Sequence, residues 1–342
     1  MHKIAVIPGD GIGPEVIEQG MSALKKSGAP LEFSIYPWGG AHYLKTGEIL
    51  PENALEELKR HAAIYLGAIG DPRVAPGVLE RGIVGVLRWD LDLYVNLRPV
   101  KLYNERYSPL KDITPRDLDI LVVRENTEDL YTGPSGFIKK NTDDEVALGT
   151  AFYTRKGVER IIRYAFGQAR RRRKKLTLCD KANAVQAQEL WRRVFSQVGA
   201  EYADVEREVI YVDACAMALV RRPRDFDVIV TTNLFGDILT DLGAELCGGM
   251  GLAPSGNFQP EKFGMFEPIH GSAPKYAGTG KANPLGAILA GSMMLDFLGE
   301  EKAAGKIEGA VARVLERGEL KSLGTDAGVT TAQIGEMVLR EL

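Results

Sequence analysis

Long apolar runs, paired cysteines and a strong net charge are all absent from this sequence of 342 residues. No run reaches the roughly 20 apolar residues that a membrane-spanning helix needs, so we expect no association with a membrane. Residues 1–7 lead straight into a strand-like run and lack the longer apolar stretch and cleavage site of a secretory signal. The 3 cysteines, Cys179, Cys215 and Cys247, form no CxxC pair, which predicts reduced, buried thiols in a cytoplasmic protein.

The net charge of −3 gives no electrostatic reason to expect a nucleic-acid partner. One basic run, RRRRKK at 170–175, follows an amphipathic helical pattern. Cations there suit the negative end of a helix dipole, and no aromatic residues that could stack on bases are interleaved with them. We therefore expect a solvated helix end and no binding of nucleic acid.

The length and composition predict a folded protein of two domains. Hydrophobic residues make up 45% of the chain and charged residues 26%, as in ordinary globular proteins. Strand-like runs alternate with helical patterns, which favours an α/β fold around a largely parallel sheet. The runs that predict strands are 31–35, 62–68, 119–124, 175–179 and 227–232, and those that predict helices include 14–27, 51–60 and a segment capped by Thr154.

Two segments depart from this alternation. The turn Gly9-Asp10-Gly11-Ile12-Gly13-Pro14 resembles a dinucleotide fingerprint, but proline stands where that motif needs its last glycine. A Rossmann fold is therefore disfavoured, while a tight turn that brings backbone close to a ligand is expected. Residues 131–154 are rich in glycine and charge and are poor core material, which predicts a projecting arm.

Three aspartates are candidate metal ligands. Asp237 and Asp241 are four residues apart, so a helix would place both carboxylates on one face, and Asp213 follows its own apolar run. Carboxylate oxygens alone suit Mg²⁺ or Mn²⁺. The alternative is that Asp237 caps a helix and Asp241 is a surface acid.

Basic residues could supply the complement to a carboxylate substrate. Arg88, Arg98 and Arg124 each stand at the edge of an apolar run, and guanidinium groups pair bidentately with carboxylates. Together they could hold a dicarboxylate, although each could instead form a surface ion pair. Lys181 directly follows a predicted strand, where an amine could act as a base, and Tyr131 stands at the start of the arm.

Motifs along the whole chain resemble those of the β-decarboxylating dehydrogenases, the family that includes isopropylmalate, isocitrate, homoisocitrate and tartrate/malate dehydrogenases. The motifs are IPGDGIGPEV at 7–16, NLRPV at 96–100, VVRENTEDLYTG at 122–133, DKANAVQ at 180–186, DACAM at 213–217, NLFGDILTDL at 233–242, GLAPSGN at 251–257 and EPIHGSAP at 267–274. Several such motifs in the family's order are far more specific than any one of these residues alone.

The resemblance implies the family's own two-domain α/β fold, not a Rossmann fold. Both chain ends, 1–95 and 246–342, would build the first, cofactor-side domain, and 96–245 would build the second. The arm, about 131–154, would clasp a partner subunit. The resemblance also implies a homodimer with shared active sites, in which Lys181 and Asp213 of one chain face the remaining site residues of the other.

The resemblance implies a role for each site residue. Tyr131 and Lys181 match the catalytic pair, and Arg88, Arg98 and Arg124 match the residues that bind the malate part of a 2-hydroxy acid substrate. Asp213, Asp237 and Asp241 match the ligands of Mg²⁺ or Mn²⁺. The residues that match the cofactor-binding set are Glu267, His270, Gly271, Ser272, Ala273, Lys275, Tyr276 and Asn283.

Cofactor and substrate choice rest on finer signals. Lys275 and Tyr276 resemble the pair that holds the 2′-phosphate in NADP-dependent isocitrate enzymes, but the stretch 320–330 lacks their supporting tyrosine and arginine, so we expect NAD, with NADP as the alternative. Ile83 and Val84 offer an apolar wall where isocitrate enzymes carry serine and asparagine, which favours 3-isopropylmalate as the substrate. Homoisocitrate, isocitrate, D-malate and tartrate are the alternatives. A non-catalytic regulatory subunit of an isocitrate dehydrogenase is a further one, which the complete catalytic set disfavours.

Overall fold

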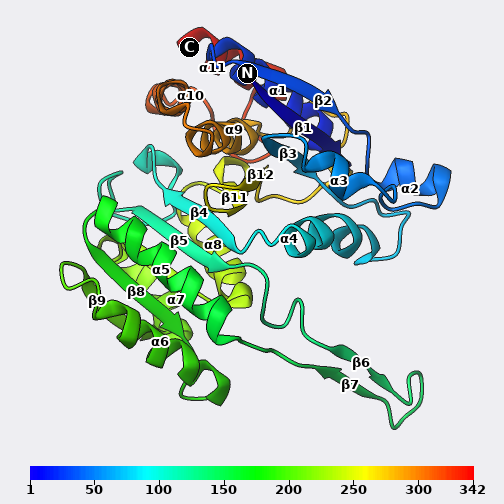
Figure 1. Cartoon of the computed structure of the whole chain (residues 1–342). Helices are drawn as coiled ribbons and strands as arrows, with labels where there is room; N and C mark the ends of the chain where they lie inside the picture. The colour runs from blue at the N-terminus through cyan, green and yellow to red at the C-terminus, as the bar shows by residue number, and fades with distance from the viewer.

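A ten-stranded mixed sheet runs through the whole molecule in the order β2-β1-β3-β12-β11-β4-β5-β10-β8-β9 (Figure 1). The computed structural model describes all residues from 1 to 342. The strands are β1 (His2–Gly9), β2 (Leu31–Ile35), β3 (Ala63–Ala68), β4 (Val95–Lys101), β5 (Asp119–Glu125), β6 (Ser135–Ile138), β7 (Val146–Gly149), β8 (Lys175–Asp180), β9 (Glu206–Tyr211), β10 (Val228–Thr231), β11 (Pro254–Gln259) and β12 (Phe263–Pro268).

Helices cover both faces of this sheet, and a π-helix (Glu80–Gly85) leads into the fourth α-helix. The α-helices are α1 (Gly13–Lys26), α2 (Gly40–Thr46), α3 (Ala54–Leu58), α4 (Val86–Asp90), α5 (Arg155–Arg171), α6 (Glu189–Gly199), α7 (Val212–Arg221), α8 (Asn233–Leu246), α9 (Leu285–Phe297), α10 (Glu301–Glu316) and α11 (Thr331–Glu341).

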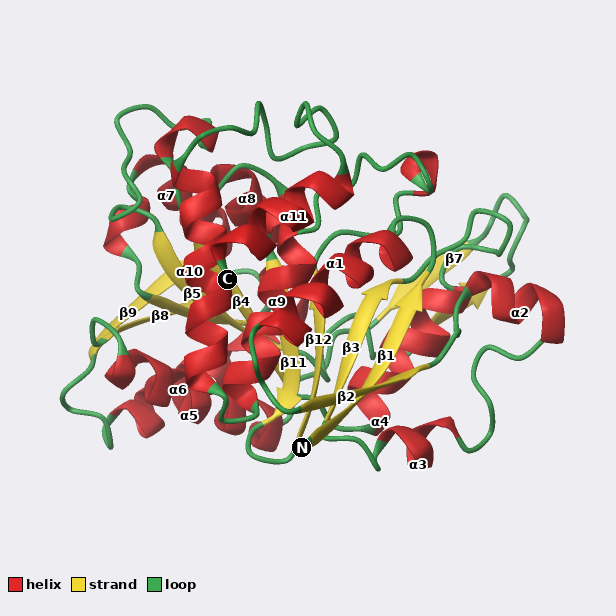
Figure 2. Ribbon diagram, turned by 90° about the horizontal axis from the view of Figure 1, so that it is seen from above, coloured by secondary structure: helices red, strands yellow, loops and turns green.

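One half of the molecule is built from both ends of the chain (Figure 1). Strands β1, β2, β3 and β12 pair in parallel, and β11 joins them antiparallel. In β1, Ile4 and Val6 face the cluster that includes α1, α9 and α10, while Ala5 and Ile7 face the cluster on the opposite side. This alternation is the period of two that a strand buried on both faces requires. Figure 2 shows α9 between α10 and α1.

The middle of the chain forms the other half. Strand β4 joins the two halves by pairing antiparallel with both β11 and β5, and β10, β8 and β9 continue in parallel. Val123 packs toward α5 and α6, whereas Val122 packs toward α7 and α8. This arrangement is compatible with the division into 1–95 plus 246–342 and 96–245, which stays a prediction.

Most of the predicted elements are confirmed, with shifted ends. Thr154 caps α5, because its side chain accepts a hydrogen bond from the backbone N–H of Gly157 at 3.0 Å. Pro14 lies in the first turn of α1. The helix expected over 51–60 is shorter: α3 has only five residues and ends at Leu58.

The arm projects from the second half as a two-stranded antiparallel hairpin of β6 and β7 (Figure 1). All residues of both strands are exposed. The sequence predicted the projection but not the regular pairing. No helix in the chain combines the length and the apolar character that crossing a membrane requires.

Candidate active site

Two buried arginines share one carboxylate at the centre of the candidate site. Arg98 lies on β4 and Arg124 at the end of β5, and Asp237 lies in the second turn of α8. Nη1 of Arg124 lies 2.6 Å from Oδ1 of Asp237, and Nη1 of Arg98 lies 3.1 Å from the same oxygen. The side chains of Arg98 and Arg124 are only 7% and 2% exposed. A single acceptor oxygen therefore contacts two buried cations, and the one negative charge of Asp237 balances only one of them.

Burial lowers the pKa of both arginines. Burial, together with the nearby Arg98, lowers the pKa of Arg124 to about 9, and burial also lowers the pKa of Arg98. Burial opposes ionisation of Asp237, but Arg124 and Arg98 outweigh it and hold the pKa of that carboxyl below its usual value. Arg98, Arg124 and Asp237 together keep one positive charge, and the neighbouring Asp241 balances it.

Asp241 lies one helical turn after Asp237 on α8. It lies 3.8 Å from Nη1 of Arg98, and its side chain is half exposed. Burial and the neighbouring Asp237 raise the pKa of Asp241. Thr232, not Asp237, occupies the N-cap position of α8, so the helix-cap alternative is wrong.

Tyr131 reaches the same cluster from the base of the arm. Its hydroxyl donates to Oδ2 of Asp237 at 2.8 Å, and the guanidinium of Arg124 lies 5.7 Å from the centre of its ring. Burial and the hydrogen bond to Asp237 raise the pKa of Tyr131 to about 12. The phenol is therefore protonated at neutral pH and is placed as a proton donor.

Arg88 comes from the other half of the molecule, on α4. Its Nη2 lies 2.7 Å from Oε1 of Glu267 on β12, and the side-chain amide of Asn257 donates to the same oxygen at 2.8 Å. Glu267, which the sequence assigned to cofactor binding, thus pairs with an arginine that the sequence assigned to the substrate. Nε of Arg88 and Nε of Arg98 are buried without a hydrogen-bond partner. Each of these two donors is therefore left unsatisfied within the protein.

Lys181 and Asp213 form a separate pair. Nζ of Lys181, just after β8, donates to Oδ2 of Asp213, in the first turn of α7, at 2.7 Å. This bond to Lys181 lowers the pKa of Asp213. Within one chain no three acidic, histidine or cysteine side chains come close enough to hold a metal ion. Asp213 is therefore not brought together with Asp237 and Asp241 in a single chain.

The glycine turn contacts the predicted cofactor loop. The backbone N–H of Ile12 donates to the carbonyl of Ser272 at 2.8 Å, and a Cβ on Gly11 would lie 1.9 Å from that oxygen. Burial lowers the pKa of His270, and its Nε2 has no partner. The side chain of Asn283, in contrast, is engaged within the protein, since its amide donates to the carbonyl of Leu323 at 3.0 Å.

The remaining predicted cofactor and specificity residues have mixed surroundings. Gly271 and Lys275 are exposed, and Ala273 and Tyr276 are half-buried. Nζ of Lys275 lies 5.6 Å from the centre of the Tyr276 ring. Ile83 is fully buried in the apolar cluster beside β1 and β3, so its side chain supports the core here instead of forming an open wall. Val84 is only partly buried.

Three supporting residues were missed by sequence reasoning. Asn233 accepts from Nη2 of Arg124 at 2.6 Å, and Thr240 accepts from Nη1 of Arg98 at 2.7 Å. Asn257 supports Glu267 as described above. The spacing of Asn233, Asp237 and Asp241, at i, i+4 and i+8 of one helix, was a signal that could have identified Asn233.

Comparisons with known proteins agree over the whole chain. Residues 3–338 match the family model described as isocitrate/isopropylmalate dehydrogenase. A 3-isopropylmalate dehydrogenase from Thermobifida fusca is 49% identical, with 99% of this chain and 97% of that protein aligned. One from Nocardia farcinica is 48% identical, with 98% of each aligned.

Solved structures with the same fold include two dehydrogenases. An isocitrate dehydrogenase from Methylococcus capsulatus has a TM-score of 0.91 and 40% identity, over 100% of this chain and 99% of that one. A β-decarboxylating dehydrogenase from Thermococcus kodakarensis has a TM-score of 0.82 and 37% identity, over 100% and 96% of the two chains.

Proposed function

This chain belongs to the isocitrate/isopropylmalate dehydrogenase family, and from that membership we infer that it is a metal-dependent dehydrogenase that uses a nicotinamide cofactor. It oxidises a malate-type 2-hydroxy acid and releases one carboxyl group as carbon dioxide. The acid is 3-isopropylmalate, because relatives that carry this activity in their names are 47–49% identical over nearly the entire chain.

The observation that carries this function is the convergence of three arginines with unfilled donors. Arg98 and Arg124 come from one half of the molecule and Arg88 from the other. The buried Nε atoms of Arg88 and Arg98 have no acceptor in the protein. A substrate with two carboxylates supplies the missing acceptors, and bidentate pairing fixes its orientation.

The chemistry of the acidic residues suits a hard divalent cation. Asp237 and Asp241 present carboxylate oxygens on one face of α8, and the one ion-pair contact of Asp241 is the 3.8 Å approach to Arg98. We propose that these two aspartates, with Asp213 of a second subunit, hold Mg²⁺ or Mn²⁺. Such an ion, when bound, acidifies the substrate hydroxyl and stabilises negative charge on oxygen.

Two separate groups handle the protons. Lys181 accepts the proton of the substrate C2 hydroxyl, and its hydrogen bond to Asp213 fixes the position of the amine. Tyr131 donates a proton to C3 after carbon dioxide has left, because its raised pKa keeps the phenol protonated and its hydroxyl points into the arginine–aspartate cluster. The two residues lie in different hydrogen-bonded groups, which suits separate steps.

The nicotinamide cofactor is held by the loop from Glu267 to Asn283. His270 offers a buried, unpartnered Nε2, and Gly271 leaves open space for a ligand, since a Cβ there meets no atom within 4 Å. We favour NAD over NADP, because Lys275 is exposed and lacks the supporting tyrosine and arginine for a phosphate. Asn283 contributes to this loop by its backbone, because its side-chain amide donates to the carbonyl of Leu323.

The active unit is a homodimer. Large apolar side chains are exposed on the helices that carry the aspartates: Met217 and Val220 on α7 are 64% and 43% exposed, and Ile238 on α8 is 58% exposed. A monomer exposes such groups at a cost, and a second copy of this face would cover them. Contact along these helices and the arm brings Lys181 and Asp213 of one chain toward Asp237 and Asp241 of the other. A location in the cytoplasm stays a prediction.

A stoichiometric assay tests this function. Purified protein with 3-isopropylmalate, NAD and Mg²⁺ is expected to release one carbon dioxide for each NAD reduced. Excess chelator is expected to stop both products, and added Mg²⁺ or Mn²⁺ to restore them. Reduction of NAD without carbon dioxide release, or full activity in chelator, would contradict the proposal.

A further inference from the structure

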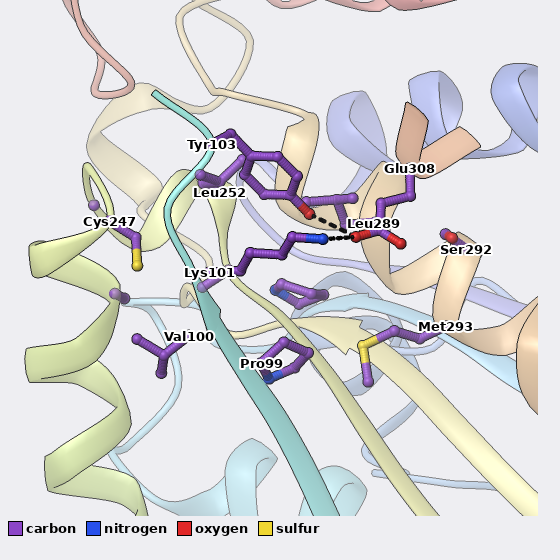
Figure 3. Close-up of a pocket in the computed structure, with 14 residues that line it drawn as sticks. Pro99, Val100, Lys101, Tyr103, Cys247, Leu252, Leu289, Ser292, Met293 and Glu308 are labelled. Atoms are coloured by element: carbon purple, nitrogen blue, oxygen red, sulfur yellow. Dashed lines mark hydrogen bonds and ion pairs between the residues drawn. The ribbon is translucent and has the colours of Figure 1, made fainter. Parts of the chain in front are cut away.

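A second cavity, distinct from the candidate active site, lies where the two halves of the molecule meet (Figure 3). It has a volume of about 100 Å³, roughly three times the volume that one water molecule occupies in the liquid. Its walls come from β4, α8 and the segment before β11, and from α9 and α10. None of its lining residues is assigned to substrate, metal or cofactor, so the proposed reaction does not use it.

The interior of this cavity, which we call the seam cavity, is apolar. Val100, Leu252, Leu289 and Met293 contribute aliphatic side chains to it. Water gains little in such a space, because it finds too few hydrogen-bond partners there. A few carbon atoms of a ligand fit these walls.

The rim of the seam cavity, in contrast, carries one cation and one anion. Nζ of Lys101 on β4 lies 2.6 Å from Oε1 of Glu308 on α10, and the hydroxyl of Tyr103 donates to the same oxygen at 3.4 Å (Figure 3). Both charged side chains are part-exposed, at 39% and 43%. They can therefore turn toward a ligand without first being uncovered.

This pattern selects for a small zwitterion with an apolar end. An ammonium group can bind Glu308 near the ring of Tyr103, and a carboxylate can bind Lys101. A more open groove next to the rim is lined by Arg116 and Arg173 and also by Asp119 and Glu316, so it adds no net charge to the rim. A purely apolar molecule would leave the ion pair unused, and a purely charged one would face apolar walls.

We propose that the seam cavity binds an α-amino acid with a branched aliphatic side chain of about the size of valine or leucine. The side chain enters the apolar interior, and the amino acid group bridges Lys101 and Glu308. Because these two residues belong to different halves of the molecule, the bound amino acid ties α10 to β4.

Titration calorimetry on the full-length protein tests this proposal with L-leucine as the probe. We compare it with 4-methylpentanoate, which lacks the ammonium group, with 3-methylbutylamine, which lacks the carboxylate, and with glycine, which lacks the side chain. L-leucine is expected to bind at one site per chain, and each of the other three at least about tenfold more weakly.

Variants locate the binding. Lys101→Met and Glu308→Gln are each expected to weaken L-leucine binding at least about tenfold, since each removes one of the two charged contacts. The matched control is the exposed pair of Lys59 and Glu56, 2.8 Å apart, where Lys59→Met and Glu56→Gln are expected to leave the affinity unchanged. Melting curves of all four variants establish that they are folded.

Several results would contradict the proposed amino-acid site. No heat of binding at L-leucine concentrations up to about 10 mM would overturn the site, as would binding that both rim variants retain. Equal affinity for 4-methylpentanoate would overturn the zwitterionic ligand class. Loss of binding in Arg98→Ala would mean that the amino acid occupies the candidate active site instead.

Discussion

At the scale of single residues, Asp237 pairs with buried arginines and is also a proposed metal ligand. In this structure its two oxygens accept hydrogen bonds from Arg124 and Tyr131, and Oδ1 also lies 3.1 Å from Nη1 of Arg98 in an ion pair. In the proposed function, the same carboxylate oxygens would hold a divalent metal ion, and the arginines would bind the carboxylates of the substrate. The pairing seen here gives both buried cations an anionic partner.

Asp237→Asn and Asp241→Asn distinguish the pairing with arginines from the proposed metal binding. Both variants are expected to lose at least about 100-fold in kcat/KM, because each removes a proposed metal ligand. Asp237→Asn should also lower the free energy of unfolding by about 1–3 kcal/mol, since it leaves two buried arginines unpaired. Asp241→Asn should not, because its contact with Arg98 is long and half exposed. Urea unfolding in chelator measures the difference, and equal stabilities would contradict it.

Substitutions of Tyr131 and Lys181 are expected to block different steps of the reaction. Lys181→Met should abolish reduction of the nicotinamide with the hydroxy acid as substrate. Tyr131→Phe should retain partial reactions of an added keto-acid intermediate, because only the final protonation at C3 needs the phenol. With a pKa of about 12, Tyr131 should impose no decline in rate up to about pH 10. Identical behaviour of both variants in every partial reaction would remove the distinction.

At the scale of elements, the glycine turn after β1 positions the cofactor loop. Gly11 has a φ of +58° and its Cα lies against the carbonyl of Ser272. Any side chain at this position would push the loop away, because the added atom would overlap that oxygen. This close approach requires glycine at position 11, as the tight turn of a dinucleotide motif also does.

Gly11→Ala is therefore expected to raise the KM for NAD by at least about tenfold and to change the KM for the hydroxy acid much less. Gly28→Ala is the matched control, since Gly28 also has a positive φ, of +86°, but nothing lies within 4 Å of an added Cβ. It shares the backbone strain but not the steric clash. Similar cofactor KM values in both variants would show that strain alone causes the effect.

Local patterns in the sequence predicted elements well and side-chain partners poorly. The cap at Thr154 and the strand 119–124 depend on neighbours in the sequence, and both are confirmed. The pairing of Arg88 with Glu267 joins residues 179 positions apart and depends on how β12 lies beside α4. Ile83 is apolar in either role, so its pattern could not distinguish a core residue from a pocket wall.

At the scale of the whole molecule, one chain is incomplete as a metal site. Asp213 and Lys181 form their own pair, and no three candidate ligands meet within the chain. Exposed apolar residues lie on the two helices that carry the candidate ligands, which are Asp213 on α7 and Asp237 and Asp241 on α8. For the proposed metal site, we therefore expect a second copy to supply the third carboxylate.

Subunit mixing tests this shared site. Lys181→Met and Arg98→Ala proteins should each be inactive, and random exchange in an equal mixture should restore roughly a quarter of the normal activity. Half of the dimers are then mixed, and each mixed dimer has one intact site. Mixing two Lys181→Met preparations is the control. An active monomer by light scattering, or no recovery after proven exchange, would contradict the shared site.

The most direct test of the central claim is a comparison of kcat/KM for 3-isopropylmalate, D-malate, tartrate, isocitrate and homoisocitrate under one set of conditions with NAD and Mg²⁺. Burial of an isopropyl group gains roughly 2 kcal/mol, whereas a third carboxylate without a partner costs several. We predict that 3-isopropylmalate exceeds each other acid at least about tenfold. A tenfold lead for D-malate or isocitrate would contradict this account of the substrate.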